Sequence, residues 1–239
     1  TGPGMENAIP VGNHPHDKRL PRLVSLTRPL ITCLLLCISA SAAQAERKVR
    51  DDTGQLVFMT APAERIISLS PAITELVYAA GAGDKLIGID TYSDYPPSAM
   101  HLPRIGSSGG LDREQLLQLQ PDLVIAWASG NKATDLRWLQ DSGIPVYRSV
   151  PAELDDIALN LLDIGVLAGT ESTASLAAQA FRDTLPDGCT NTTSNDYIPV
   201  FYEVWSKPTM TIGGQHWLNE VLQRAGMKNI FADQDRAIL

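Results

Sequence analysis

Alternating strand and helix patterns constrain the fold of this chain of 239 residues more than any other feature. Residues 65–69 form a short β-branched run, residues 73–80 follow with helical spacing up to Gly81, and residues 86–89 form a second apolar run. A loop with Tyr92 and two prolines comes next. Strands that alternate with helices predict a parallel sheet with both faces covered. Ligands bind beyond the carboxyl ends of such strands, so the loops after both strands are candidate site loops.

The same order continues along the chain. Residues 49–59 alternate around Asp-Thr-Gly and predict a leading β-hairpin. Asp112 is the expected N-cap of the next helix, and Pro121 ends that helix. Further elements are expected as helices at 112–120 and 131–142 and strands at 122–127 and 144–147. Together these patterns predict a first α/β lobe over residues 46–150.

The pattern changes after Pro151. Residues 153–185 form one helix pattern with an apolar stripe, which predicts a single long helix connecting two lobes, with bounds at 151–186. A polar linker and the start of a second α/β lobe occupy residues 187–239, with a strand at 198–204 and a helix at 218–225. A lobe needs on the order of 100 residues for its own core, so we expect this second lobe to be incomplete.

Residues 1–45 resemble an export signal. Three arginines precede the apolar run at residues 30–38, and small residues follow up to Ala45. These are the parts of a secretory signal peptide, and they predict cleavage after Ala45 and a periplasmic protein. The apolar run is shorter than the roughly 18 to 20 residues that span a bilayer, which disfavours an uncleaved anchor, and the residues before Cys33 and Cys37 disfavour a lipoprotein. Residues 1–4, before Met5, are excluded from the fold analysis.

Composition excludes several classes of function. Residues 46–239 contain 15 lysines and arginines against 25 acidic residues. This balance argues against nucleic acid and against binding to anionic membranes. The four histidines have no ligand-like spacing, so no metal site is expected. Cys189 is the single cysteine after residue 45, so this part cannot form an internal disulfide.

One enzyme pattern is present. Gly106, Ser108 and Gly110 fit G-x-S-x-G, with His216 downstream, which is the order of a serine hydrolase. A strong strand should precede such a nucleophile, but residues 101–104 do not form one. The segment is better explained as a flexible loop before a capped helix. We therefore expect no catalytic residue and no enzyme activity.

Several motifs, taken together, resemble a known family. RIISLSPAITELVYAAG, TYSDYPP, GSSGGLDREQLLQLQPDLVIAW, FYEVW and GGQHWLNEVLQRAGMKNIF occur in this order over residues 64–231. The set resembles the class III substrate-binding proteins of cobalamin and iron-siderophore ABC importers. TYSDYPP and PDLVIAW are most similar to the periplasmic cobalamin-binding proteins. The resemblance implies two α/β lobes with parallel sheets, joined rigidly by one long helix, and a ligand bound in the cleft between them.

The resemblance also implies roles for individual residues. Ligand contacts would come from Pro71, Ala72, Tyr92, Trp127 and Trp205, and from Ser108, which stands where close relatives carry a tryptophan. Glu114 would dock to arginines of the importer's membrane subunits. Structural alternatives stay open for two of these residues. Trp127 could serve core packing alone, and Glu114 could be a first-turn carboxylate favoured by the helix dipole alone.

The resemblance implies binding and delivery without chemistry. The expected ligand is a corrinoid such as cobalamin, which is transported cargo, and no prosthetic group is expected. The expected partners are the transmembrane subunits of an ABC importer, and the protein is expected to be a monomer without stable membrane insertion. A ferric siderophore or haem is the alternative ligand. The first-lobe loops offer mainly Arg104 against an acidic chelate, which favours a neutral ligand stacked on aromatic rings.

Overall fold

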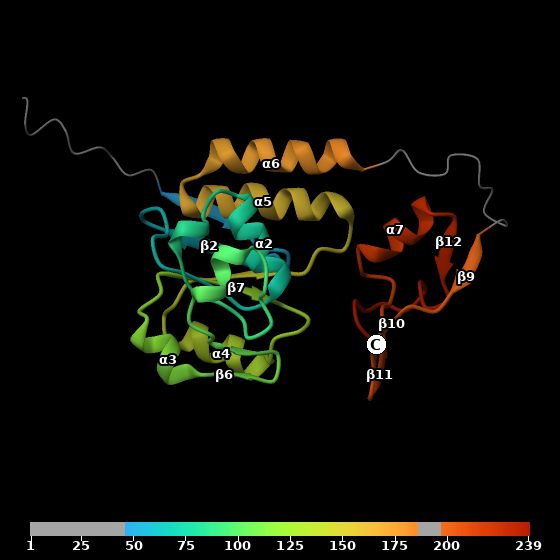
Figure 1. Cartoon of the computed structure of the whole chain (residues 1–239), viewed down its shortest axis with the longest axis horizontal. Helices are drawn as coiled ribbons and strands as arrows, with labels where there is room; N and C mark the ends of the chain where they lie inside the picture. The colour runs from blue at the N-terminus through green and yellow to red at the C-terminus, as the bar shows by residue number, and fades with distance from the viewer. Residues whose placement is uncertain (1–45, 186–196) are drawn as a thin grey trace, which may run out of the picture. The chain divides into compact units, whose positions relative to one another are not determined.

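The computed structural model describes residues 46–185, called here the N-terminal part, and residues 197–239, the C-terminal part (Figure 1). The predicted signal peptide, its cleavage site and Cys189 lie outside the described residues. Among the described helices, none is both long and apolar enough to cross a membrane.

A four-stranded parallel sheet forms the centre of the N-terminal part. Its strand order is β4 (Leu86–Gly88), β3 (Ile66–Ser68), β7 (Leu123–Trp127) and β8 (Val146–Ser149). Ile66 pairs with Leu123, and Val124 pairs with Val146. The two central strands are buried almost throughout, as strands covered on both faces must be. This arrangement confirms the predicted α/β fold with a parallel sheet.

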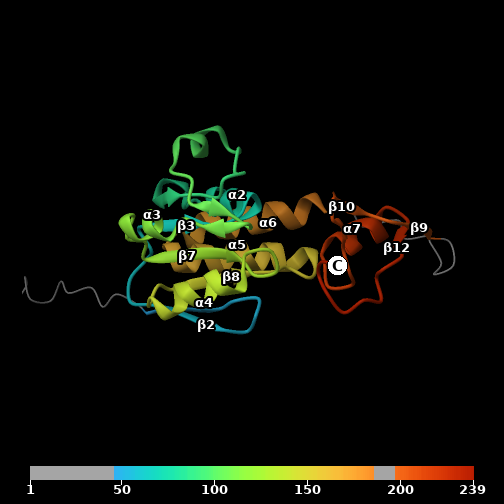
Figure 2. The ribbon, with the colours of Figure 1, turned by 90° about the horizontal axis from the view of Figure 1, so that it is seen from below.

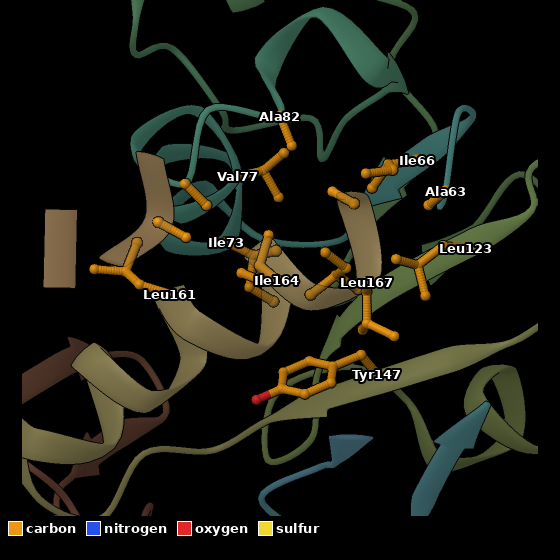
Figure 3. Packing of buried hydrophobic residues seen from close by; sticks show 14 of the residues in the cluster. Ala63, Ile66, Ile73, Val77, Ala82, Leu123, Tyr147, Leu161, Ile164 and Leu167 are labelled. Carbon is orange, nitrogen blue, oxygen red and sulfur yellow. The ribbon is translucent and has the colours of Figure 1, made fainter. Parts of the chain in front are cut away.

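Helices cover both faces of this sheet (Figure 2). On one face, Ile66 and Ile125 join a core with α2 (Pro71–Ala79) and two later helices. On the other face, Ile67 and Val124 join a second core with α3 (Arg113–Gln118) and α4 (Ala133–Asp141). Neighbouring strand residues therefore contribute to opposite cores, because successive side chains of a strand point to opposite faces. Figure 3 shows side chains of the first core from β3, α2, β7 and β8.

Local sequence signals fix the helix ends. The Ser70 hydroxyl accepts a hydrogen bond from the Ile73 N–H at 3.3 Å and caps α2. Asp112 caps α3 in the same way by accepting from the Gln115 N–H at 2.9 Å, as predicted. Gly143, beyond α4, has a φ of 73°, the left-handed conformation typical of a residue that ends a helix.

The expected single long helix over residues 153–185 is wrong. The chain instead forms α5 (Leu154–Ala168) and α6 (Glu171–Thr184), which lie side by side (Figure 1). Gly169 separates them with a φ of 73°, a conformation that glycine adopts without strain. Gly165 of α5 lies so close to Ala174 of α6 that an added Cβ would overlap the alanine methyl group. Sequence periodicity continued across this reversal because both helices bury an apolar face.

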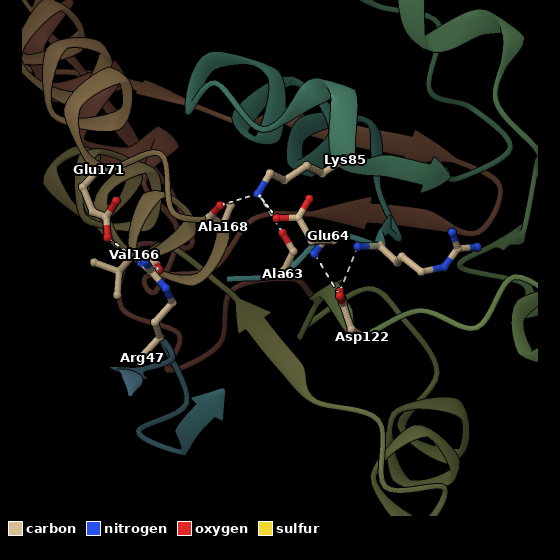
Figure 4. A network of polar contacts seen from close by, with 9 residues as sticks. Arg47, Ala63, Glu64, Lys85, Asp122, Val166, Ala168 and Glu171 are labelled. Carbon is tan, nitrogen blue, oxygen red and sulfur yellow. Dashed lines mark hydrogen bonds and ion pairs between the residues drawn. The ribbon is translucent and has the colours of Figure 1, made fainter. Parts of the chain in front are cut away.

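A polar network joins elements at the amino ends of the strands (Figure 4). The Lys85 ammonium donates to the Ala63 carbonyl at 3.0 Å and to the Ala168 carbonyl, at the end of α5, at 2.7 Å. The Asp122 carboxylate accepts from the Glu64 N–H at 2.8 Å and from the Arg65 N–H at 3.0 Å. A cation at a helix C-terminus is favourable, so the network stabilises the end of the sheet opposite to the loops predicted to bind ligand.

The predicted leading hairpin is confirmed as β1 (Arg47–Arg50) and β2 (Leu56–Met59). Asp51 shapes its turn by accepting from the Thr53 and Gln55 N–H groups at 3.0 and 2.9 Å. Asp52 binds the hairpin to the sheet, because its carboxylate accepts from the Val150 N–H at 2.6 Å. The hairpin thus belongs to the N-terminal part.

The C-terminal part contains short elements. β9 (Ile198–Val200) pairs in parallel with β12 (Met227–Asn229), and β10 (Glu203–Ser206) pairs antiparallel with β11 (Thr209–Thr211). The single strand expected at 198–204 is therefore two strands, and the expected helix is confirmed as α7 (Leu218–Arg224). Asn219 and Asn229 are buried and bonded to each other at 3.0 Å, and their side-chain amides donate to nearby loop carbonyls.

Candidate functional site

Three turns and one helix start meet at the carboxyl ends of the strands in the N-terminal part. They are the turn after β4, the hairpin of β5 (Gly106–Ser107) and β6 (Gly110–Leu111), the turn after β7, and the start of α2 after β3. The first two adjoin because the Thr91 N–H donates to the Gly106 carbonyl at 2.7 Å. The last two adjoin because the Asn131 amide donates to the Leu69 carbonyl at 3.0 Å. These segments contain every predicted ligand residue except Trp205.

Tyr92 lies on the turn after β4 with 69% of its surface exposed. The buried Asp90 carboxylate accepts from the Tyr92 N–H at 2.7 Å. Arg104 holds the same turn, since its guanidinium donates to the Asp90 carbonyl at 3.1 Å and also to the Ser93 carbonyl. Burial raises the pKa of Asp90, although the backbone N–H donors of Tyr92 and Thr91 and the charge of Arg104 act in the opposite direction. The backbone is therefore fixed while the phenol ring projects outward.

Trp127 is the last residue of β7 and is half-buried against the first core. Asn131 closes its turn by accepting from the Trp127 N–H at 2.7 Å and donating to the Leu69 carbonyl. Gly130 lies against the indole, and a Cβ there would overlap the ring. Both contacts fix the tryptophan at the carboxyl end of its strand. Its partial burial is compatible with core packing and with one exposed edge for a ligand.

Ser108 lies at the tip of the β5–β6 hairpin, where the prediction was a flexible loop. The Ser107 hydroxyl accepts from the Gly109 N–H at 3.1 Å and stabilises this tight turn. A hydrolase nucleophile instead sits on a sharp turn from a strand into a helix. In this chain a turn between two short strands carries Ser108, so the structure does not provide that geometry. The exposed hydroxyl remains free to contact a ligand.

Pro71 and Ala72 form the first turn of α2. Ala72 is exposed and Pro71 is partly exposed, so both offer a small apolar surface beside the Trp127 turn. Proline suits this position because its fixed φ is pre-organised for a helix and its missing N–H would have no partner there. The local sequence Ser-Pro-Ala therefore explains why the helix starts here and why its first turn carries only small apolar side chains.

Glu114 is exposed in the first turn of α3. Its carboxylate accepts a weak hydrogen bond from the Gln118 amide at 3.4 Å. The position is favourable for a carboxylate because of the helix dipole, and the group remains accessible to a cationic partner.

Trp205 belongs to β10 of the C-terminal part. The residue is 62% exposed, and its indole N–H donates to the Lys207 carbonyl at 3.1 Å. His216, the second hydrolase candidate, accepts from the Leu218 N–H at 3.2 Å, and burial lowers the pKa of its imidazole. Trp205 and His216 thus each form a hydrogen bond with the backbone two residues further along the chain.

Sequence reasoning missed the side chains that hold the turns, above all Thr74, Ser93 and Asn131. Each is buried, and each bonds to another segment of the site. The available signal was a short polar residue three to five positions after the end of a buried strand or the start of a helix. Within residues 46–185 and 197–239, no group of three or more histidine, cysteine or acidic side chains could hold a metal ion.

The sequence model of the periplasmic binding protein family matches residues 66–237, and the chain belongs to this family. A vitamin B12-binding protein of Vibrio cholerae is 42% identical over 183 residues, covering 77% of this chain and 66% of that protein. A vitamin B12-binding protein of Yersinia pestis is 40% identical over 176 residues, covering 72% and 61% of the two chains.

Solved structures give the same grouping. The crystal structure of the periplasmic vitamin B12 binding protein BtuF of Vibrio cholerae matches with a TM-score of 0.67 at 42% identity, covering 74% of this chain and 70% of that chain. A periplasmic heme binding protein from Pseudomonas aeruginosa matches with a TM-score of 0.60 at 26% identity, covering 70% and 62%. By sequence, the chain spans 66% and 61% of the length of the two vitamin B12-binding proteins, which is less than two thirds of each.

Proposed function

We propose that this protein captures a corrinoid of the vitamin B12 class in the periplasm and delivers it to an ABC importer. The observation that carries the proposal is the 42% identity to a vitamin B12-binding protein over 183 residues, which include the turns of Tyr92 and Trp127. The predicted cleft between two lobes, the corrinoid as transported cargo, and function as a monomer without chemistry are parts of this proposal.

The chemistry of the first-lobe turns supports a corrinoid. A corrinoid has a flat macrocycle surrounded by amide side chains. Aromatic rings bury apolar area with little loss of side-chain entropy, while hydroxyl and backbone groups can bond the amides. The site offers this combination in Tyr92, Trp127 and Ser108. Trp205 would supply a further ring from the C-terminal part.

The role of Arg104 disfavours an acidic siderophore chelate. Its guanidinium is half-buried and donates to carbonyls of the Tyr92 turn and, at 3.4 Å, to the Met100 carbonyl. A group bound to its own loop in this way is not free to pair with catecholate or carboxylate oxygens. Arg104 is therefore a structural residue of the Tyr92 turn.

Haem is the second candidate ligand. The favouring observations are the similarity to a heme binding protein and the exposed phenol of Tyr92, since tyrosine can hold haem iron. The two ligands would contact different groups of Tyr92. Haem would need the phenol oxygen, and a corrinoid would need the ring.

Isothermal titration of the purified protein with cyanocobalamin, haemin and a ferric siderophore tests the ligand. We expect a dissociation constant in the micromolar range or below for cyanocobalamin, a loss of at least about tenfold in Trp127→Ala or Tyr92→Ala, and little change in Tyr92→Phe. Tight haemin binding that disappears in Tyr92→Phe, without cyanocobalamin binding, would replace the corrinoid by haem.

Delivery is tested separately from binding. Glu114→Lys should leave cyanocobalamin affinity unchanged and strongly reduce B12-dependent growth, because a rim charge sets docking orientation more than the ligand site. Asp141→Lys, a matched reversal of another exposed helical carboxylate, should support normal growth. Equal growth of the two variants would argue against docking through Glu114.

Export is tested by sequencing the amino terminus of the secreted protein. Cleavage after Ala45 predicts Glu46 as the first residue. A protein that retains residues 30–38 would instead be membrane-anchored.

A further inference from the structure

A chain of three buried hydroxyl groups runs beneath the Tyr92 turn. The Thr74 hydroxyl of α2 lies 2.6 Å from the Ser68 hydroxyl at the end of β3 and 2.9 Å from the Ser93 hydroxyl. It also donates to the Ser70 carbonyl at 3.1 Å. Ser68, Thr74 and Ser93 are all fully buried. The chain therefore links the sheet, the start of α2 and the turn after β4.

Hydrogen-bond counting fixes the direction of this chain. A threonine hydroxyl has one proton to donate and two lone pairs to accept with. Since Thr74 donates to the Ser70 carbonyl, the serines on both sides must donate to Thr74. The Thr74 oxygen is thereby saturated. Buried polar groups need partners, so neither serine hydroxyl can leave Thr74 without cost.

Ser93 directly follows Tyr92, which gives this chain a role in the site. The Tyr92 turn is fixed on one side by Asp90, which accepts from the Tyr92 N–H. On the other side, the Ser93 side chain anchors the turn through its hydroxyl, which bonds to Thr74 of α2. The same helix starts with Pro71 and Ala72, the other predicted ligand contacts on this side.

We infer that Ser93 and Thr74 are positioning residues, which fix the turn that carries Tyr92 relative to the start of α2, so that the ligand meets a preformed wall. This inference rests on the proposed function and names the device that orders its site. Pre-organisation of a binding wall lowers the entropy lost on binding, so its loss appears as weaker affinity. Because both side chains are fully buried, they are expected to act through Tyr92 and not by contact with the ligand.

Two serine variants separate positioning from folding. Ser93→Ala removes the link between Thr74 and the Tyr92 turn, and Ser68→Ala removes the link between Thr74 and the sheet. Both delete one buried hydroxyl that donates to the same oxygen, and both leave Thr74 bonded to the Ser70 carbonyl. Similar losses of stability are expected, but Ser93→Ala alone should disturb Tyr92.

Binding of cyanocobalamin by titration calorimetry is the first readout. We expect Ser93→Ala to weaken binding about three- to tenfold and Ser68→Ala to leave it within twofold. In a Tyr92→Ala background, Ser93→Ala should have no further effect, because a residue that acts through Tyr92 cannot act without it. Thr74→Val should resemble Ser93→Ala in affinity, and Thr74→Ser, which keeps the hydroxyl, should restore it.

Amide hydrogen exchange without ligand is the second readout. Ser93→Ala should speed exchange of the Tyr92 and Ser93 amides, which both bond to Asp90, and Ser68→Ala should not. Equal exchange and equal affinity in the two variants would overturn the inference. If the wild-type protein binds no cyanocobalamin, the proposed function fails, and the exchange comparison still decides whether Ser93 orders the turn.

Discussion

Two tryptophans of this molecule are held in contrasting ways. Trp127 ends a buried strand, lies half-buried on the core, and has its turn closed by the buried amide of Asn131. Trp205 lies on a two-stranded hairpin whose strand β10 is exposed at every residue, and its indole bonds only to the neighbouring Lys207 carbonyl among the described contacts. Both rings are candidates for ligand contact, but they differ in what fixes them.

The difference teaches what a fixed aromatic wall requires. A strand that is paired on both sides sets the position of its last residue, and a buried polar side chain then sets the few residues that follow. An exposed hairpin has no such support, because two strands alone are marginally stable in water. The N-terminal turns are therefore expected to be ordered before the ligand binds, and the hairpin of Trp205 less so. We expect the affinity for the ligand to depend more on those turns than on this hairpin.

The largest expected contrast comes from truncating each ring. Trp127→Ala should lower the free energy of unfolding of the N-terminal part by about 2–4 kcal/mol, because it removes packing from the core. Trp205→Ala should change stability by less than about 0.5 kcal/mol, as expected for an exposed side chain. Urea unfolding followed by circular dichroism measures both. Equal losses would refute the distinction between the two rings.

Removing the closing amide should come next. Asn131→Ala leaves the Trp127 N–H and the Leu69 carbonyl without their partner, and should cost about 2–3 kcal/mol of unfolding free energy. Thr134→Ala, an exposed change in the first turn of the following helix α4, should cost less than about 0.5 kcal/mol. A cost below 1 kcal/mol for Asn131→Ala would mean that water replaces the amide in the turn.

A smaller effect is expected from crowding the indole. Gly130→Ala places a methyl group where the Trp127 ring lies, so the ring or the turn must shift at a cost of about 1–2 kcal/mol. Near-ultraviolet circular dichroism should report the displaced tryptophan. Ser129→Ala, at an exposed neighbouring position, should leave that spectrum unchanged. An unchanged spectrum in Gly130→Ala would show that the ring is not fixed by this contact.

The smallest expected effect is an opposite pH response of the two parts. Burial raises the pKa of Asp163 on α5 to about 6, with Tyr147 donating to it at 3.0 Å. Its folded pKa exceeds the unfolded value, so the N-terminal part gains stability as pH falls from above 6 towards 4. Burial lowers the pKa of His216, so neutral His216 contributes stability to the C-terminal part above the ordinary histidine pKa. This contribution decreases as pH falls below that value and is lost below the folded pKa.

Hydrogen exchange at pH 7 and pH 5, corrected for intrinsic rates, measures this response in each part. Asp163→Asn should reduce the response of the N-terminal part, because an amide keeps the bond to Tyr147 without a charge. Burial also raises the pKa of Asp52 and of Asp90, so these two carboxyls should supply the remaining response. A parallel response of the two parts would show that other groups control the pH dependence.

Sequence patterns predicted the strands and most helices of the N-terminal part because its core is continuous. Ile66, Ile67 and the run at β7 are buried on both faces, which makes the pattern unambiguous. The break at Gly169 was missed because α5 and α6 pack on each other, and the apolar spacing therefore continues through the turn. A glycine in the left-handed conformation was the one local sign of the reversal.

The candidate site was predictable in place but not in its supports. The end of β7 placed Trp127, and the loop after β4 placed Tyr92, since ligand loops follow the carboxyl ends of parallel strands. Thr74 and Asn131 act across 19 and 62 positions of sequence, on Ser93 and Leu69 respectively. No local pattern carries a partner at such separation. The roles of Tyr92, Trp127, Trp205 and Glu114 stay predictions.

The network of Lys85 and Asp122 lies at the strand ends opposite to the turns predicted to bind ligand. One consequence concerns protein engineering. A sheet stabilised at one end leaves the turns at its other end open to replacement. Exchanging residues 107–110 for the loop of another binder would leave Lys85, Asp122, the helix pair and the bond between Ser93 and Thr74 in place. The lobe would then serve as a scaffold on which new ligand specificities could be selected.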